Sequence, residues 1–77
     1  MNLTASQCRA ARSLVGWTAG DLSKASGVHS STLSRFEGGG DVYASTLEKL
    51  REALEKAGVL FIAADASGGP GVRLRHE

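Results

Sequence analysis

The chain has 77 residues, with nine basic and eight acidic side chains, two histidines and a single cysteine. Its length suits one small domain, which buries only about 60% of its unfolded surface, and the lone Cys8 excludes an internal disulfide. The formal net charge of +1 excludes a strongly basic nucleic-acid binder, so any DNA binding has to depend on where the charges lie.

A first helix is predicted over about Ala5 to Val15. Thr4 and Gln7 have the spacing of a capping box, in which each side chain bonds the other residue's backbone N–H. Gly16 is the residue type that ends a helix in the left-handed conformation. The side chains expected to be buried are Cys8, Ala11, Leu14 and Val15, and those expected on the outer side are Arg9 and Arg12.

Two short helices joined by a tight turn are predicted between Thr18 and Gly38. Thr18 and Asp21 have the spacing of a second capping box, and Gly27 stands where the turn needs a residue that tolerates a positive φ. The side chains expected to face inward are Leu22, Ala25, Val28, Leu33 and Phe36.

The second of these helices, over about residues 29–37, is left with a polar outer face. That face carries His29, Ser30, Ser31, Ser34 and Arg35. A short helix with small hydrogen-bonding side chains and one Arg outward suits the major groove of DNA. The pattern therefore predicts a DNA-reading helix, with Arg35 as the main reader because Arg to guanine is the commonest specific contact.

Three glycines, Gly38 to Gly40, follow this helix and precede Asp41. One interpretation is a plain helix terminator followed by a flexible loop. The other is a loop whose N–H groups approach a phosphate. A triple glycine alone does not decide between them.

A fourth helix is predicted from Ser45, as the cap of a third capping box with Glu48, to about Ala57, with Gly58 as its C-terminal cap. The spacing of apolar residues predicts a core face on this helix. That face consists of Leu47, Leu50, Leu54 and Ala57.

The tail changes from helical to strand-like pattern. Val59–Ala63 is an unbroken apolar run, and Val72–Arg75 alternates apolar and basic residues after a loop rich in Gly and Pro. Two paired strands are the simplest interpretation. Because the first strand is apolar on both faces and the helices can cover only one, we expect this tail to pair with its copy in a second chain. The predicted boundaries are 1–58 for the helical domain and 59–77 for the tail.

Six segments together follow the pattern of a known family. They are Gln7–Arg12, Gly16–Thr18, Asp21–Leu22, Ser26–Val28, Thr32–Glu37 and Gly39. Residues 7 to 58 thus resemble the lambda-repressor-like (Cro-type, XRE-family) helix-turn-helix domain. The tail resembles that of very short bacterial members of this family, which are compact and usually homodimeric transcriptional regulators.

The resemblance implies a mainly α, four- to five-helix domain with a short C-terminal β element, a strand or hairpin, used in dimerisation. It implies a homodimer that binds a palindromic operator in double-stranded DNA. The implied base contacts are Ser30, Ser31, Ser34 and Arg35, and the implied phosphate contacts are Thr18, His29, Thr32, Gly39 and Gly40. The residues expected in the dimer contact are Val59, Leu60, Phe61, Ile62, Val72 and Leu74.

A protein-interaction module of the same fold, such as an antitoxin or an adaptor, is the alternative. The low net charge favours it, as does Ala19, which stands where the family commonly has a Gln that contacts a phosphate. A copurifying protein partner would distinguish it from a regulator for which DNA is the main ligand.

No enzyme activity is expected from this sequence. His29 and His76 are far apart, and no carboxylate pair or metal-ligand spacing is present. We therefore expect no catalytic residue, no metal and no cofactor. A single Cys, with neither a signal peptide nor a long apolar run, favours a cytoplasmic protein that does not associate with membranes.

Overall fold

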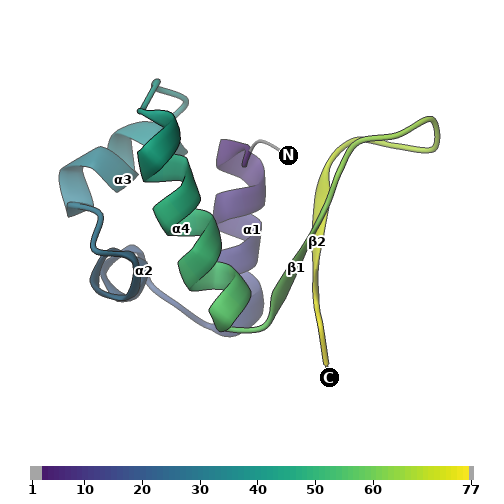
Figure 1. The fold of residues 1–77 in the computed structure, drawn as a ribbon, viewed down its shortest axis with the longest axis horizontal. Helices are drawn as coiled ribbons and strands as arrows, with labels where there is room; N and C mark the ends of the chain where they lie inside the picture. The colour runs from purple at the N-terminus through teal and green to yellow at the C-terminus, as the bar shows by residue number, and fades with distance from the viewer. Residues whose placement is uncertain (1–2, 77) are drawn as a thin grey trace.

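The computed structural model describes residues 3–76, so residues 1, 2 and 77 of the predicted regions 1–58 and 59–77 lie outside the described part. That part is a mainly helical, compact domain with a small antiparallel sheet (Figure 1). The elements in chain order are α1 (Ala5–Val15), α2 (Ala19–Ser26), α3 (Ser30–Glu37), α4 (Ala44–Lys56), β1 (Val59–Ile62) and β2 (Gly71–Leu74). None of the helices within residues 3–76 has the length and apolar character needed to cross a membrane.

The predicted starts of α1 and α2 are confirmed. In α1, Thr4 Oγ1 accepts the Gln7 N–H at 3.0 Å, and Gln7 Oε1 accepts the Thr4 N–H at 3.0 Å. Thr18 and Asp21 form the same reciprocal pair at α2, at 3.1 and 2.9 Å. These boxes satisfy backbone donors that a helix leaves without partners in its first turn.

The predicted capping box at α4 is wrong. The helix begins at Ala44, and its N-cap, Tyr43, makes no side-chain capping bond. The N–H groups of Thr46 and Leu47 already bond the Tyr43 carbonyl, so Ser45 lies inside the first turn. At the other end α4 stops at Lys56 and Ala57 is the cap, one residue earlier than predicted.

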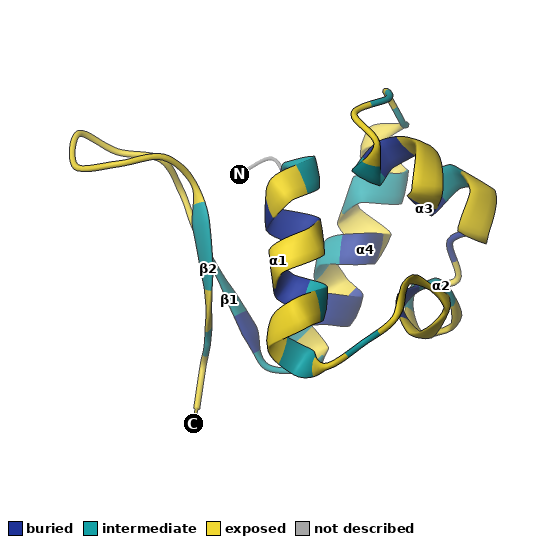
Figure 2. Cartoon of the chain, turned by 180° about the vertical axis from the view of Figure 1, so that it is seen from behind, coloured by how far each residue is buried: buried dark blue, intermediate teal, exposed yellow. Residues whose placement is uncertain are grey.

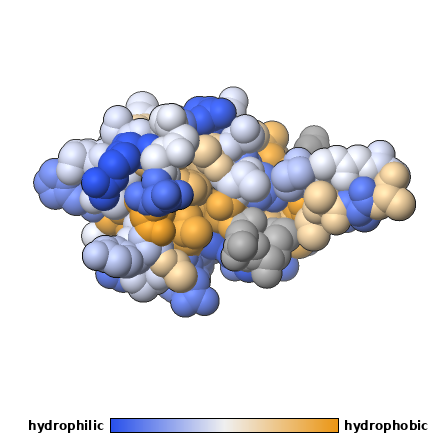
Figure 3. Space-filling model, turned by 90° about the horizontal axis from the view of Figure 1, so that it is seen from above, coloured by the Kyte–Doolittle hydropathy of each residue, from blue (hydrophilic) through white to orange (hydrophobic). Residues whose placement is uncertain are grey.

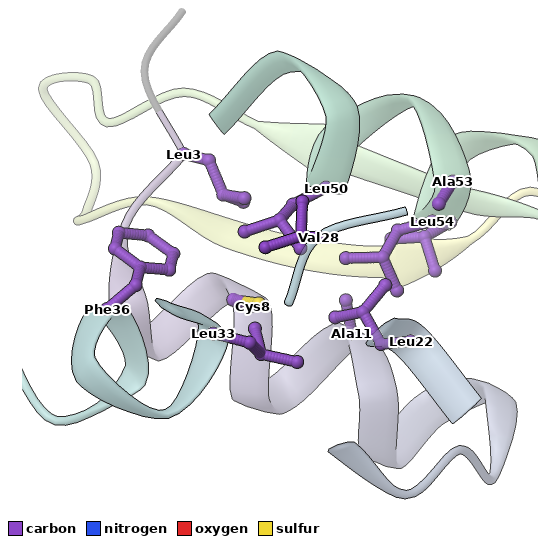
Figure 4. Packing of buried hydrophobic residues seen from close by; sticks show 11 residues of the cluster. Leu3, Cys8, Ala11, Leu22, Val28, Leu33, Phe36, Leu50, Ala53 and Leu54 are labelled. Carbon is purple, nitrogen blue, oxygen red and sulfur yellow. The ribbon is translucent and has the colours of Figure 1, made fainter. Parts of the chain in front are cut away.

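The core lies between the four helices and the first residue of β1. Its largest fully buried side chains are Cys8, Leu22, Leu33, Leu50, Leu54 and Val59. Figure 4 shows the helical members of this set meeting Leu3 and Val28 in one cluster. Side chains from every helix thus contribute to a single core, which fixes the position of α3 on the domain.

Two side chains predicted to be buried are exposed. Leu14 lies two turns after Gln7, on the side of α1 that faces the sheet. Because this sheet has only two strands and is narrow, it leaves the Leu14 side chain 40% exposed. Ala25 is exposed while Ser26 is half-buried. The inner face of α2 therefore contains Leu22 and Ser26, four positions apart, and does not include Ala25, which is three positions after Leu22.

The tail forms a hairpin within one chain. β1 and β2 are antiparallel, with Val59 opposite Leu74 and Ile62 opposite Gly71. Phe61 and Val72 pack against the core together with the buried Val59. The predicted pair of strands is confirmed, and β1 and β2 pair with each other within the same chain.

Candidate nucleic-acid interface

The predicted base-contact residues lie together on the outer face of α3. Ser30, Ser31, Ser34 and Arg35 are all exposed, while Leu33 is 0% exposed and Phe36 is 7% exposed. Exposed residues cover the side of α3 that faces away from the other helices (Figure 2). In Figure 3 hydrophilic atoms cover the end of the molecule that holds α3, and apolar atoms gather toward the middle of the face. This helix therefore presents a polar, accessible surface on an apolar support.

His29 caps α3 and restrains Ser31. Its Nδ1 accepts the Ser31 N–H at 3.1 Å and lies 2.8 Å from Ser31 Oγ. A neutral His that accepts a backbone N–H at Nδ1 carries its proton on Nε2. His29 is exposed, so that Nε2–H group is a donor at the edge of the α3 surface.

Thr18 lies at the start of α2, beside an ionised carboxylate. The Thr18 backbone N–H bonds Asp21 Oδ2 and lowers the pKa of this carboxyl below its usual value. The Thr18 hydroxyl oxygen is used as an acceptor for the Asp21 N–H. A side-chain hydrogen bond between Thr18 and the Asp21 carboxylate lowers that pKa further, so the Thr18 hydroxyl is already engaged with Asp21.

The glycine loop folds back on the last turn of α3. Gly38 N–H bonds the Ser34 carbonyl, Gly39 N–H the Phe36 carbonyl and Gly40 N–H the Arg35 carbonyl, at 3.0, 3.0 and 2.8 Å. These N–H groups already have partners, so the interpretation as a helix terminator fits this loop. The predicted phosphate contacts at Gly39 and Gly40 lack the free N–H on which they depended.

A groove of about 430 Å³ separates α3 from the start of α4. Its lining consists of Thr32, Arg35, Asp41, Val42, Tyr43 and Thr46. Thr32, a predicted phosphate contact, is thus brought next to Arg35. The four other lining residues were not predicted from the sequence. The signal that could have pointed to them is Tyr43, an aromatic residue shortly before a predicted helix start, which is 83% exposed.

A charged cluster under α3 ties this helix to α1. Arg12 Nε and Nη2 donate to the two carboxylate oxygens of Glu37 at 2.8 and 2.7 Å, and Cys8 Sγ donates to Glu37 Oε2 at 3.2 Å. Arg9 donates to the Glu37 carbonyl oxygen. The prediction that Arg12 lies on the outer side is wrong, because its guanidinium reaches over the edge of α1 and is only 20% exposed.

The same cluster sets three ionisation equilibria. Burial would raise the pKa of Glu37, but the hydrogen bonds from Arg12 and Cys8 outweigh it and leave the pKa lowered. The bond with Glu37 raises the pKa of Arg12. Burial, reinforced by the bond to Glu37, raises the pKa of Cys8 to about 12. At neutral pH the cluster is a carboxylate and guanidinium pair with a neutral thiol beside it.

We expect Cys8 to be unreactive toward thiol reagents in the folded protein. Its side chain is 0% exposed, and with a pKa of about 12 the thiolate that reacts is scarce at neutral pH. Labelling with a chromogenic disulfide at pH 7 should therefore follow the rate of global unfolding and accelerate only with denaturant. Rapid labelling in buffer alone would contradict the buried position of Cys8.

No protein-family model matches this sequence, and a search of curated proteins finds no match.

Proposed function

We propose that the protein is a lambda-repressor-like helix-turn-helix transcriptional regulator that binds double-stranded DNA as a homodimer. The observation that carries the proposal is the division of α3 into two faces. Leu33 and Phe36 are buried, and the polar residues from Ser30 to Arg35 that face outward are exposed, except for the half-buried Thr32.

The dimensions of α3 suit the major groove. A helix of eight residues is about 12 Å long, and the major groove of B-DNA is about 12 Å wide. The preceding helix, α2, joins α3 through Gly27, whose φ is +75°, and both helices pack on the same core. We infer that α3 enters the groove while α2 lies across the sugar–phosphate backbone, as in helix-turn-helix proteins.

The dimer contact we propose uses the outer face of the hairpin. Val59, Phe61 and Val72 pack on the chain's own core, so half of the predicted dimer residues are already used. Leu60 and Ile62 alternate with them on β1, and Ile62 is 38% exposed. A contact between two copies would therefore centre on Leu60 and Ile62. Leu74, which lies opposite Val59, is on the inner face and is left out of this contact.

Selection from randomised duplex DNA, at two salt concentrations, tests the proposal. We expect enrichment of a palindrome whose half-sites lie about 34 Å, one helical turn, apart. Sedimentation of the free protein at tens of micromolar should show a dimer. No enrichment at either salt concentration would contradict sequence-specific binding, and a monomer would contradict the homodimer.

Arg35→Ala should weaken recognition at one base position of each half-site by about 1–3 kcal/mol. Arg35 is exposed on α3, and its guanidinium can form two bonds with a guanine. Competition binding with single-base variants of the selected site measures the loss. Arg75→Ala, an equal change in charge at an exposed residue beyond β2, is the matched control. An unchanged preference in Arg35→Ala would exclude Arg35 as a reader.

A protein-interaction module is the second candidate function. Leu14 and Ile62 are 40% and 38% exposed, which leaves apolar surface beside α1 and on the hairpin for a partner. If DNA selection gives no enrichment while a single protein copurifies in stoichiometric amount and its binding is lost in Ile62→Asp, this second function replaces the first.

A further inference from the structure

Gly40 and Arg35 approach each other unusually closely. A Cβ placed on Gly40 would lie 2.6 Å from Arg35 Cγ, 3.0 Å from the Arg35 carbonyl oxygen and 3.4 Å from Arg35 Cδ. Carbon atoms in contact are normally about 3.5–4.0 Å apart. At Gly39 and Gly68, by contrast, an added Cβ would meet nothing within 4 Å. The space that a side chain at position 40 would need is therefore occupied by the stem of Arg35.

The backbone of Gly40 does not itself require glycine. The glycines with a positive φ among residues 3–76 are Gly16, Gly27, Gly39 and Gly58. Gly40 is outside this set, so the backbone at this position accepts an L-residue. Its N–H bond to the Arg35 carbonyl, at 2.8 Å, holds the loop against the end of α3. The obstacle to a side chain at position 40 is thus Arg35.

We propose that Gly40 is a specificity-determining residue that positions Arg35. By lacking a Cβ it lets the Arg35 stem lie along the loop backbone, and this fixes the direction in which the guanidinium leaves α3. This inference rests on the proposed DNA-binding function and assigns Gly40 a role different from a phosphate contact. A methyl group at position 40 displaces Cγ, which moves Arg35 to another χ1 rotamer and its guanidinium away from the base it reads.

A double-mutant cycle tests the proposal, with wild type, Gly40→Ala, Arg35→Ala and the double variant. The readout is the base preference at each position of the selected operator. We expect Gly40→Ala to lose about tenfold in discrimination at the Arg35 position alone. In the Arg35→Ala background we expect no change from Gly40→Ala, because the shortened side chain has no Cγ to displace. An added Cβ at position 40 also contacts the main-chain carbonyl oxygen of residue 35, which is present in both backgrounds. Any shift of the loop caused by this backbone contact therefore cancels in the cycle.

Gly68→Ala, in the open connection between the strands, is the matched control and should leave all preferences unchanged. Thermal unfolding shows whether each variant folds. The proposal is overturned if Gly40→Ala keeps the wild-type preference, or if it alters preferences equally in both backgrounds. If Gly40→Ala does not fold, a double variant that does fold supports the clash with the Arg35 stem, and a double variant that is also unfolded overturns it.

A second readout separates this proposal from the proposed function. In the free wild-type protein, NMR should show a nuclear Overhauser effect between Gly40 Hα and Arg35 Hγ, together with one dominant χ1 rotamer of Arg35. Loss of that rotamer preference in Gly40→Ala supports positioning, and its absence in the wild type overturns positioning. A wild-type protein that selects no DNA sequence overturns the function and, with it, the specificity role, whatever the rotamer.

Discussion

Glu37→Gln should lower the free energy of unfolding by about 2–3 kcal/mol at neutral pH. The variant keeps the volume of the side chain but leaves the Arg12 guanidinium, only 20% exposed, without its carboxylate. It also exchanges two short charge-assisted bonds, at 2.7 and 2.8 Å, for weaker neutral ones. Chemical denaturation at pH 7 measures the loss.

The same substitution should remove part of the acid sensitivity of the protein. The pKa of Glu37 is lowered in the folded state from its ordinary value of 4.5, so the folded protein holds the ionised form more strongly than the unfolded chain does. The contribution of ionised Glu37 to the free energy of unfolding is therefore complete above about pH 4.5, and it is lost as the pH falls through the pKa of Glu37 in the folded state. The difference in stability between wild type and Glu37→Gln should shrink over that range.

Glu55→Gln is the matched control, because it makes the same Glu-to-Gln change in another ion pair. Glu55 pairs with Arg51 four residues earlier on α4, at 3.2 Å, with both side chains about a third exposed. Exposed pairs of this kind contribute less than about 1 kcal/mol, so this variant should remain within about 0.5 kcal/mol of wild type. A loss in Glu37→Gln no larger than that would show that the Arg12–Glu37 pair does not hold α3 to α1.

The features that local sequence decides were predictable. The capping boxes at Thr4 and Thr18 depend on residues three positions apart, and the turn at Gly27 on a single residue that tolerates a positive φ. The polar outer face of α3 follows from the spacing of Leu33 and Phe36 alone. The start of α4 was missed because the capping pattern at Ser45 competes with backbone bonds that begin at Tyr43.

The features missed by sequence analysis depend on residues far apart in the chain. Arg12 and Glu37 are 25 positions apart, and periodicity on α1 alone placed Arg12 in solvent. Gln7 was recognised as a capping residue, yet its amide also reaches β1 and β2, 55 and 64 positions away. A local pattern cannot show that one side chain has both roles. The clash at Gly40 likewise appears only when the loop has folded back on α3.

Gln7→Leu should cost about 2–3 kcal/mol and loosen the hairpin more than the helices. Gln7 is 2% exposed, and its Nε2 donates to the carbonyl oxygens of Ile62 and Gly71 at 3.3 and 3.0 Å. Leu fills a similar volume but removes both bonds, each worth about 0.5–1.5 kcal/mol, and it leaves the Thr4 N–H without its Gln7 acceptor. Amide hydrogen exchange, residue by residue, should accelerate in β1 and β2 beyond the change in global stability.

Thr4→Ala separates the two roles of Gln7. It removes the hydroxyl that accepts the Gln7 N–H but leaves the Gln7 amide bonds to the hairpin, so we expect a loss of about 1 kcal/mol, typical of a helix cap. Exchange in the hairpin should then follow global stability. Because a two-stranded hairpin is only marginally stable alone, equal exchange in the two variants would mean that the apolar contacts of Val59, Phe61 and Val72 hold the strands without Gln7.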